Sequence, residues 1–279
     1  MDNNYITYLF GNRESKNTVK AYTKAICDML EYIQKDENDI IYDDLIRWKS
    51  SIAHYASASM AQKIAAVKDY FKYLYVSGKI DNNPAENLKS VKVKNAQKIP
   101  LSGEQIRAMI DATNVARNKA IIMTLATTCM RISELTSITL AQYQHRINDT
   151  IIIYGKGGKE RKVRFEMETI AYINEYLKHR KNTDCKLLFV SNQGTRMNPQ
   201  CTGDMLKMCA RKAGIENWEE MHICNHLMRT SGATIKYHNG ANVEILQNIL
   251  GHTSVQTTIK HYIKNIEDKA MEVMSVAGF

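Results

Sequence analysis

Apolar side chains in the N-terminal part of this chain recur with the period of an α-helix, and few folds are compatible with that pattern. Between residues 19 and 33 they are spaced by three and four, which places them on one helix face. They are Val19, Tyr22, Ile26, Met29, Leu30 and Ile33. A second amphipathic segment starts at Leu45, and a third runs from an N-cap at Ser59 to a stop at Gly78. With a short helix after the turn at Asn82–Pro84, this part is predicted to be almost entirely helical.

Residues 89–98 break the helical period. The stretch reads KSVKVKNAQK, with four lysines and no acidic residue. We interpret it as an extended linker between two domains, which is the domain number expected for 279 residues. The capping-box pattern Ser102–Gln105 then predicts the start of a helix.

The C-terminal part has a mixed pattern. A helix is predicted over residues 118–128. Residues 150–154 are rich in β-branched side chains, residues 155–158 form a glycine turn, and residues 160–165 alternate, which together predict a β-hairpin. Residues 187–190 predict another short strand, and the remainder is predicted to be helical. The expected fold class is therefore mainly α, with a small antiparallel β-sheet.

Charge and hydropathy limit the kind of partner. The chain has 38 basic and 29 acidic residues, a net charge of +9, which favours a polyanionic partner without identifying one. No apolar run approaches the ~20 residues that span a bilayer. The first residues also lack the basic and apolar regions of a secretory signal. We therefore expect a cytoplasmic protein that does not bind membranes, with its six scattered cysteines as free, buried thiols.

Four segments in a fixed order carry side chains suited to phosphodiester chemistry. They are Thr127–Leu135 (TTCMRISEL), Gly155–Val163 (GKGGKERKV), His226–Thr234 (HLMRTSGAT) and Leu250–Tyr262 (LGHTSVQTTIKHY). In this order they resemble the tyrosine recombinases, the integrase family that includes Xer recombinases, phage integrases and Cre. The resemblance covers residues 99–279, and the helical part with its linker suits the family's core-DNA-binding domain.

The resemblance implies six catalytic residues when it is carried over position by position. Arg131 matches the family's first arginine, Lys156 its hairpin lysine, His226 and Arg229 its H-x-x-R pair, His252 the histidine of L-G-H, and Tyr262 the nucleophile. In the family, attack on DNA yields a 3′-phosphotyrosine and a free 5′-hydroxyl, so strands are rejoined without ATP. No metal or other cofactor is expected.

Elementary chemistry supports these residue types. A phosphodiester in its transition state needs charge stabilisation, and a guanidinium supplies a permanent charge with a planar fork of donors. A tyrosine, with a pKa near 10, needs a base or nearby positive charge before it attacks. His226 is our candidate base, His252 can hydrogen-bond the phosphate, and a hairpin lysine can protonate the leaving 5′ oxygen. Lys159 could supply that proton instead; Lys156 is preferred because it occupies the lysine of the family's G-K-G.

Some features also have simpler interpretations. Seen alone, Arg131 is a surface arginine paired with Glu134. His222 and His226 have the spacing of zinc ligands on one helix face, but no Glu follows His222 as in H-E-x-x-H, so we expect packing and no metal site. The sequence also departs from the family pattern, because Tyr262 follows His252 at an interval of ten positions where many Xer proteins have an interval of nine. Further departures are Met228, Thr230 and Gly232, the last where an aromatic residue is common.

Basic residues in the linker and hairpin are the candidate DNA contacts. They are Lys89, Lys92, Lys94, Lys98, Lys159 and Arg161. Such residues bind phosphates without reading sequence. Alternatively, the linker is a solvated connector and the hairpin a solvated turn, and these residues make no contact with DNA.

The resemblance implies a C-shaped clamp on double-stranded DNA. It would consist of a helical core-DNA-binding domain (1–92), a basic linker (93–99) and a mainly helical catalytic domain with a small antiparallel sheet (100–279). The implied activity is site-specific strand exchange, in integration, excision or resolution, by a homotetramer on two DNA sites. We expect a minimal Xer-like enzyme of a mobile element or of plasmid resolution, and no accessory protein is indicated. The tail at 263–279 either docks on a neighbouring protomer or folds onto its own domain.

Two other functions fit part of the pattern. A topoisomerase-like enzyme would use the same tyrosine chemistry to relax supercoils, but the compact C-terminal part with its L-G-H argues against it. A DNA-binding protein of the same fold without strand exchange is the second, and the complete set of six residues argues against it.

Overall fold

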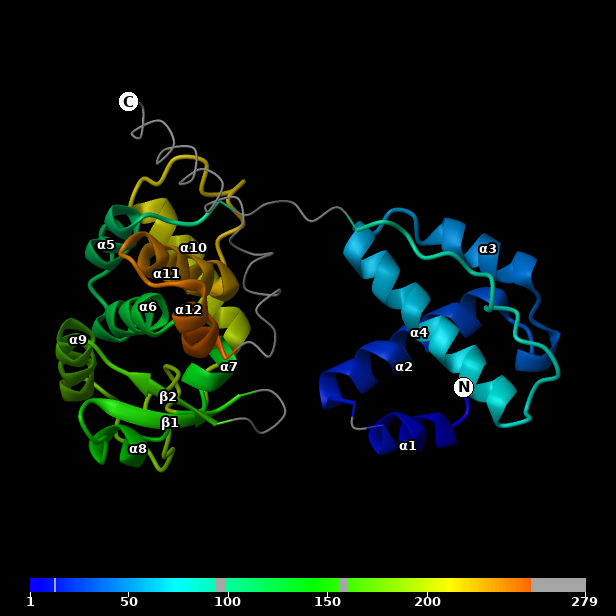
Figure 1. Ribbon diagram of the computed structural model, residues 1–279, viewed down its shortest axis with the longest axis horizontal. Coiled ribbons are helices and arrows are strands. Elements are labelled where there is room, and N and C mark those ends of the chain that lie inside the picture. The colour runs from blue at the N-terminus through cyan, green and yellow to red at the C-terminus, as the bar shows by residue number, and fades with distance from the viewer. Residues whose placement is uncertain (13, 94–98, 156–159, 252–279) are drawn as a thin grey trace. The chain divides into compact units, whose positions relative to one another are not determined.

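The chain folds into two compact units, residues 1–97 and 98–279. The structure, a computed structural model, describes residues 1–12, 14–93, 99–155 and 160–251. Figure 1 draws both units, and each is considered by itself.

The N-terminal unit is helical, as its apolar period predicts. Its elements are α1 (Asn4–Gly11), α2 (Lys16–Ile33), the 3₁₀ helix η1 (Glu37–Asp39), α3 (Tyr42–Ser51) and α4 (Ser57–Val76). The stripe on α2 packs into the core against α4, where Ile26, Met29, Ile64 and Phe71 are fully buried. Burial of this apolar face, rather than helix propensity, accounts for most of the stability of such helices.

Two local predictions in this unit are wrong. Helix α4 begins at Ser57 rather than after Ser59, because the Met60 N–H already donates to the Ala56 carbonyl at 3.0 Å. The short helix expected after Pro84 is a series of turns, since its N–H groups bond three residues back and the Asn83 side chain takes the Ala85 N–H. The predicted stop at Gly78 is confirmed, with φ of +67° just after the helix end.

The C-terminal unit is built around one buried helix. Its elements are α5 (Gly103–Asp111), α6 (Ala116–Thr128), α7 (Ile132–Leu135), α8 (Leu140–Gln144), β1 (Thr150–Tyr154), β2 (Glu160–Arg164), α9 (Met167–Lys178), α10 (Pro199–Lys212), α11 (Asn225–His238) and α12 (Val243–Leu250). Helix α6 packs against α5, α9 and α11, and is buried on nearly all sides as the central helix of the unit. The predicted capping box at the start of α5 is confirmed, with Ser102 and Gln105 bonding each other's backbone N–H.

The β-hairpin is confirmed as an antiparallel pair. Ile151 pairs with Val163 and Ile153 with Arg161, so these four side chains share one face of the sheet. That face is buried at Ile151, Ile153 and Val163. Arg161 therefore points the same way as the apolar residues of the hairpin. In Figure 1 the hairpin lies at the end of the unit away from α5 and α10.

The strand predicted at residues 187–190 does not form. This stretch makes only isolated bridges, Leu187 with Thr139 and Val190 with Arg196. Arginine side chains occupy three of its carbonyls. The Arg180 guanidinium donates to those of Leu187 and Leu188 at 2.8 and 3.2 Å, and Arg117 donates to that of Val190 at 2.9 Å.

The mainly α class with a small antiparallel sheet is thus confirmed. Within the described residues, no helix combines the length and the apolar character that crossing a bilayer requires. The six cysteines all lie within the described residues and are free thiols as predicted, but Cys27 and Cys201 are exposed rather than buried.

Candidate active site

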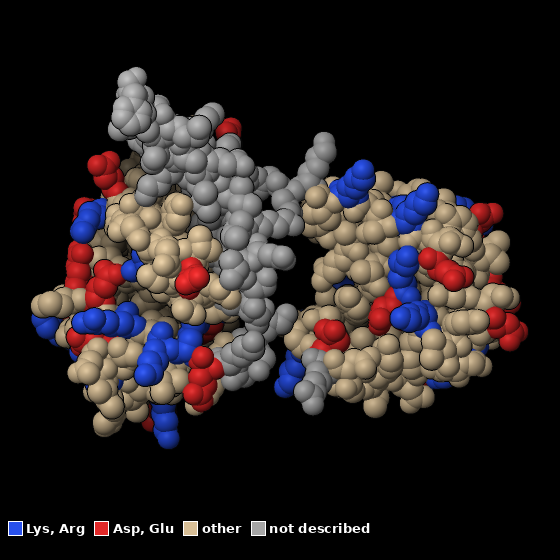
Figure 2. Space-filling view, viewed as in Figure 1, with Lys and Arg blue, Asp and Glu red and all other residues tan. Residues whose placement is uncertain are grey.

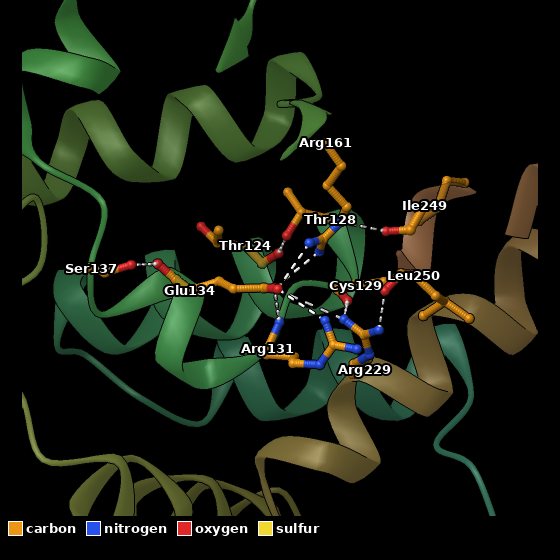
Figure 3. A network of polar contacts seen from close by, with 10 residues as sticks. All are labelled: Thr124, Thr128, Cys129, Arg131, Glu134, Ser137, Arg161, Arg229, Ile249 and Leu250. Atoms are coloured by element: carbon orange, nitrogen blue, oxygen red, sulfur yellow. Dashed lines mark hydrogen bonds and ion pairs between the residues drawn. The ribbon is translucent and has the colours of Figure 1, made fainter. Parts of the chain in front are cut away.

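A single carboxylate, Glu134, organises a cluster of three arginines from three elements (Figure 3). Arg161 of β2 donates from Nη1 and Nη2 to its two oxygens, each at 3.0 Å. Arg131, just before α7, donates from Nη1 at 3.0 Å. Arg229 of α11 has Nη1 4.0 Å from the same carboxylate. The structure thus brings together the two predicted arginines, and adds Arg161 and Glu134 to them.

Arg131 is presented by a sharp turn between α6 and α7. Cys129 ends α6 in the left-handed conformation, with φ of +52°, and Arg131 then occupies the N-cap position of α7. The Arg131 backbone N–H donates to Glu134 at 2.6 Å, so the carboxylate holds both the main chain and the side chain of this arginine. The Arg131 side chain remains 36% exposed. Part of this side chain is therefore accessible to a ligand.

Arg229 lies deeper and is held by main-chain oxygens. Its Nη1 donates to the Cys129 carbonyl at 2.7 Å, and its Nη2 donates to the Leu250 carbonyl. Burial lowers the pKa of Arg229 to about 10, with the charge of Arg131 adding to the effect. At neutral pH the guanidinium therefore keeps its proton.

The cluster carries an excess of positive charge. Burial alone would raise the pKa of Glu134, but hydrogen bonds from Arg161 and from the Arg131 backbone outweigh it, and the pKa lies below its usual value. One ionised carboxylate then faces three guanidinium groups. On the face of the molecule in Figure 2, by contrast, basic and acidic side chains are interspersed. The local surplus suits a bound anion such as a phosphodiester.

Gly232 explains how α11 comes so close to α6. A Cβ at this position would lie 1.9 Å from the Ala126 carbonyl oxygen, so only glycine fits. An aromatic residue, common here in the family that the sequence resembles, would need a wider spacing of these helices. Closeness of α11 to the end of α6 is also what lets Arg229 reach the Cys129 carbonyl.

The other predicted site residues divide into two groups. His226 is exposed in the first turn of α11, one turn before Arg229. Lys89 and Lys92 are exposed. The remaining ones lie outside the described residues: Lys94, Lys98, Lys156, Lys159, His252 and Tyr262. The same holds for the tail at 263–279.

Arg161 is bound by groups of the protein itself rather than being free to contact DNA as predicted. The sequence suggested a DNA contact, whereas its side chain is only 9% exposed and is engaged by Glu134 and by the Ile249 carbonyl. A signal was present in the sequence. Arg161 is in phase with Val163 and Phe165, the alternating residues that predict the buried side of the strand.

The histidine pair considered for zinc does not lie on one helix face. Helix α11 begins at Asn225, and His222 precedes it in a turn with φ of +51°. Among the described residues, no group of three His, Cys, Asp or Glu side chains is arranged to hold a metal ion.

Models of two protein families match this chain. That of the phage integrase family matches residues 100–268, and that of the phage integrase N-terminal SAM-like domain matches residues 3–78. Among curated relatives, the tyrosine recombinase XerD of Yersinia pestis is 27% identical over 259 residues, which cover 88% of this chain and 85% of XerD. The tyrosine recombinase XerA of Pyrococcus furiosus is 28% identical, covering 91% of this chain and 86% of XerA.

Solved structures share the fold. The XerH site-specific recombinase bound to a palindromic difH substrate, in a post-cleavage complex, aligns with a TM-score of 0.72 and 20% identity over 90% of this chain and 78% of its own. A lambda integrase (75–356) dimer bound to a COC′ core site aligns with a TM-score of 0.74 and 13% identity over 92% of both chains.

Proposed function

The chain belongs to the phage integrase family and is a tyrosine-type site-specific recombinase, and from this premise we propose that it cuts and rejoins double-stranded DNA through a 3′-phosphotyrosine at Tyr262. The proposal includes strand exchange between two DNA sites, in integration, excision or resolution. It assigns DNA binding to both units, with residues 1–92 as the helical domain, 93–99 as the linker and 100–279 as the catalytic domain.

The meeting of Arg131 and Arg229 at one carboxylate carries this proposal. Their guanidinium groups come from residues 98 positions apart, yet both lie within 4.0 Å of Glu134. Glu134 offsets only part of their charge, because Arg161 takes both of its oxygens. Two fixed cations, one of them with a partly exposed side chain, supply the charge that the non-bridging oxygens of a phosphodiester require in the transition state.

The proposed reaction balances without an external energy source. The phenol oxygen of Tyr262 attacks phosphorus as the bond to the 5′ oxygen breaks, and His226 accepts the phenolic proton. Lys156, or Lys159 in its place, gives a proton to the leaving 5′ oxygen. His252 donates a hydrogen bond to the phosphate. Because one ester replaces another, the reverse attack by a 5′-hydroxyl rejoins the strand.

The neighbouring structures support the choice of partner. XerH and the lambda integrase dimer are both bound to DNA in structures that share this fold. We extend this to double-stranded DNA as the partner of this chain and to a homotetramer on two sites as its active assembly. A cytoplasmic enzyme encoded by a mobile element would fit these features.

A trapped covalent adduct tests the proposal. Nicked duplexes, tiled across the DNA that flanks the gene, are mixed with the wild type, with Tyr262→Phe and with Tyr237→Phe as a matched control. We expect a denaturant-resistant adduct with the wild type and Tyr237→Phe, but none with Tyr262→Phe. An adduct that survives Tyr262→Phe contradicts the assignment of the nucleophile.

This experiment and a second assay separate the two alternatives. Tight and specific binding without an adduct would indicate a DNA-binding protein of the same fold. For an adduct-forming protein, a second assay offers two cognate sites on supercoiled DNA. Relaxation without exchange would indicate a topoisomerase-like enzyme, whereas recombinant products support strand exchange.

A further inference from the structure

Arg161 joins three parts of the C-terminal unit through one side chain. It belongs to β2, its Nη1 and Nη2 bind Glu134 of α7, and its Nε donates to the Ile249 carbonyl of α12 at 3.0 Å. Figure 3 shows the guanidinium between the carboxylate and the end of α12. Three different nitrogens are therefore engaged by two separate elements of the fold.

The end of α12 is held by two arginines at successive carbonyls. Arg161 binds the Ile249 carbonyl and Arg229 binds the Leu250 carbonyl. The last carbonyls of a helix have no partner within it and carry the negative end of its dipole, so cations stabilise them. Gly251 follows with φ of +60°, and a Cβ there would lie 3.0 Å from the Arg161 Cδ. The Arg161 stem thus packs directly against the backbone where α12 ends.

Arg161 also sets how Glu134 is shared. A carboxylate accepts about four hydrogen bonds, and Arg161 supplies two of them in a bidentate arrangement. Without Arg161 both carboxylate oxygens would be more available to Arg131 and to Arg229, whose Nη1 is 4.0 Å away. Those two guanidinium groups would then have more of their positive charge offset by the carboxylate.

We propose that Arg161 is a positioning residue for strand cleavage: it fixes the C-terminal end of α12, and so the point from which the chain enters residues 252–262, and it does not contact the DNA phosphate. This rests on the proposed function, because those residues include His252 and Tyr262. The consequence is specific. Loss of Arg161 slows the attack of the tyrosine while leaving the affinity for DNA unchanged.

The test compares Arg161→Gln and Arg161→Lys with the wild type in the full chain. Lysine keeps the charge but offers a single donor position, so it cannot bridge Glu134 and Ile249 at once. Arg164→Gln, at an exposed position on the same strand, is the matched control. Single-turnover cleavage of a nicked duplex is measured at saturating protein, well below the Tm of each variant, together with the salt dependence of binding.

A second substrate identifies the step that is slowed. Its scissile phosphate has sulfur in place of the bridging 5′ oxygen. Tyrosine attack then breaks the P–S bond, and the thiolate leaves without needing a proton. A defect in proton donation by the hairpin lysine is therefore rescued on this substrate, whereas a displaced tyrosine is not.

We expect Arg161→Gln to cleave both substrates about a hundredfold more slowly, since small displacements of reacting groups have effects of this size. Arg161→Lys should be intermediate, Arg164→Gln should match the wild type, and all should bind with the same salt dependence. If Arg161→Gln does not fold, Arg161→Lys carries the test, with slower cleavage on both substrates as its expected result.

Several results would overturn the proposal. A salt slope reduced by about 0.9, with cleavage of the saturated complex unchanged, would make Arg161 a phosphate contact. Rescue by the sulfur substrate would assign it to the proton donor. A lower Tm with normal cleavage would make it purely structural. Each of these leaves the wild-type adduct intact, whereas absence of that adduct would count against the proposed function itself.

Discussion

Arg161 and Glu134 face each other fork to fork, with each terminal nitrogen of the guanidinium 3.0 Å from one carboxylate oxygen. Both side chains are nearly buried, with 9% and 4% exposed. A buried ion pair gains little over an apolar pair of the same volume, but removing one partner leaves an uncompensated charge. The importance of the pair therefore lies in the elements that Arg161 connects, β2, α7 and α12, rather than in a net gain in the free energy of folding.

Replacement of Glu134 tests how much the fold depends on this carboxylate as the counter-ion of the buried arginines. Glu134→Gln leaves two buried arginines without their counter-ion, so we expect a loss of about 3 kcal/mol in the free energy of unfolding at pH 7. Urea unfolding followed by Trp218 fluorescence, in a Trp48→Phe background, measures it. The lowered pKa of Glu134 makes its contribution fully present above the usual value of 4.5 and lost as the pH falls through the lowered pKa. Wild type and Glu134→Gln should therefore converge in acid; parallel pH profiles would contradict the assignment.

Substitution of Arg131 should separate catalysis from binding. Arg131→Lys keeps a charge but loses the planar fork, and loss of one such donor costs about 10²–10³ in rate. We expect that loss in single-turnover cleavage, with DNA affinity changed by less than about threefold, because a lysine still neutralises the phosphate. Arg146→Lys, an arginine that pairs with Asp149 in the same unit, is the control and should cleave normally. Cleavage by Arg131→Lys at nearly the wild-type rate would argue against a phosphate contact.

Gly203 and Gly232, which lie inside two helices of the C-terminal unit, should respond in opposite ways to alanine. Gly232→Ala forces a Cβ against the Ala126 carbonyl at 1.9 Å, so α11 must shift, at a cost of about 1–3 kcal/mol or more. Gly203→Ala meets nothing closer than 3.7 Å within α10, and should be neutral or stabilising by about 0.5–1 kcal/mol. Urea unfolding of both variants checks this. Equal effects would mean that the contact between α6 and α11 is looser than described.

The linker lysines should control the electrostatic part of DNA binding. Replacing Lys89, Lys92, Lys94 and Lys98 together by glutamine should reduce the slope of log affinity against log salt by about 0.9 for each phosphate that these lysines neutralise. Lys178→Gln, where the lysine pairs with Glu175, is the control and should leave the slope unchanged. An unchanged slope in the fourfold variant would make the linker a solvated connector.

The residues that sequence analysis located well are those with a periodic or local signal. The stripe on α2 and the buried side of the second hairpin strand follow from spacing alone, because burial of one face decides both. The helix start predicted at Ser59 and the short helix predicted after Pro84 are wrong. Helix ends depend on which backbone N–H and carbonyl groups bond three or four residues away, and spacing does not reveal this. The strand predicted at residues 187–190 is wrong because arginine side chains take carbonyls there, Arg180 those of Leu187 and Leu188 and Arg117 that of Val190.

The site shows a similar division. Arg131 and Arg229 could be identified from motifs, because each lies within a short recognisable string. The role of Glu134 could not, since a glutamate three residues after an arginine is usually a surface partner. Only the tertiary structure brings Arg161 and Arg229 to the same carboxylate from 27 and 95 positions away.

Among the residues that the structure describes, the hydrophobic contact that holds α12 is small. It consists of Cys129, Ala233, Leu246 and Leu250, with a few partly buried neighbours, whereas α6 is enclosed on nearly all sides. A helix held in this way opens locally at a lower free energy than the whole unit unfolds. Amide hydrogens of α12 should exchange with solvent well before those of α6. The binding and release of α12 at the arginine cluster is thus an equilibrium separate from unfolding of the whole unit. A bound ligand can shift it while the core stays folded.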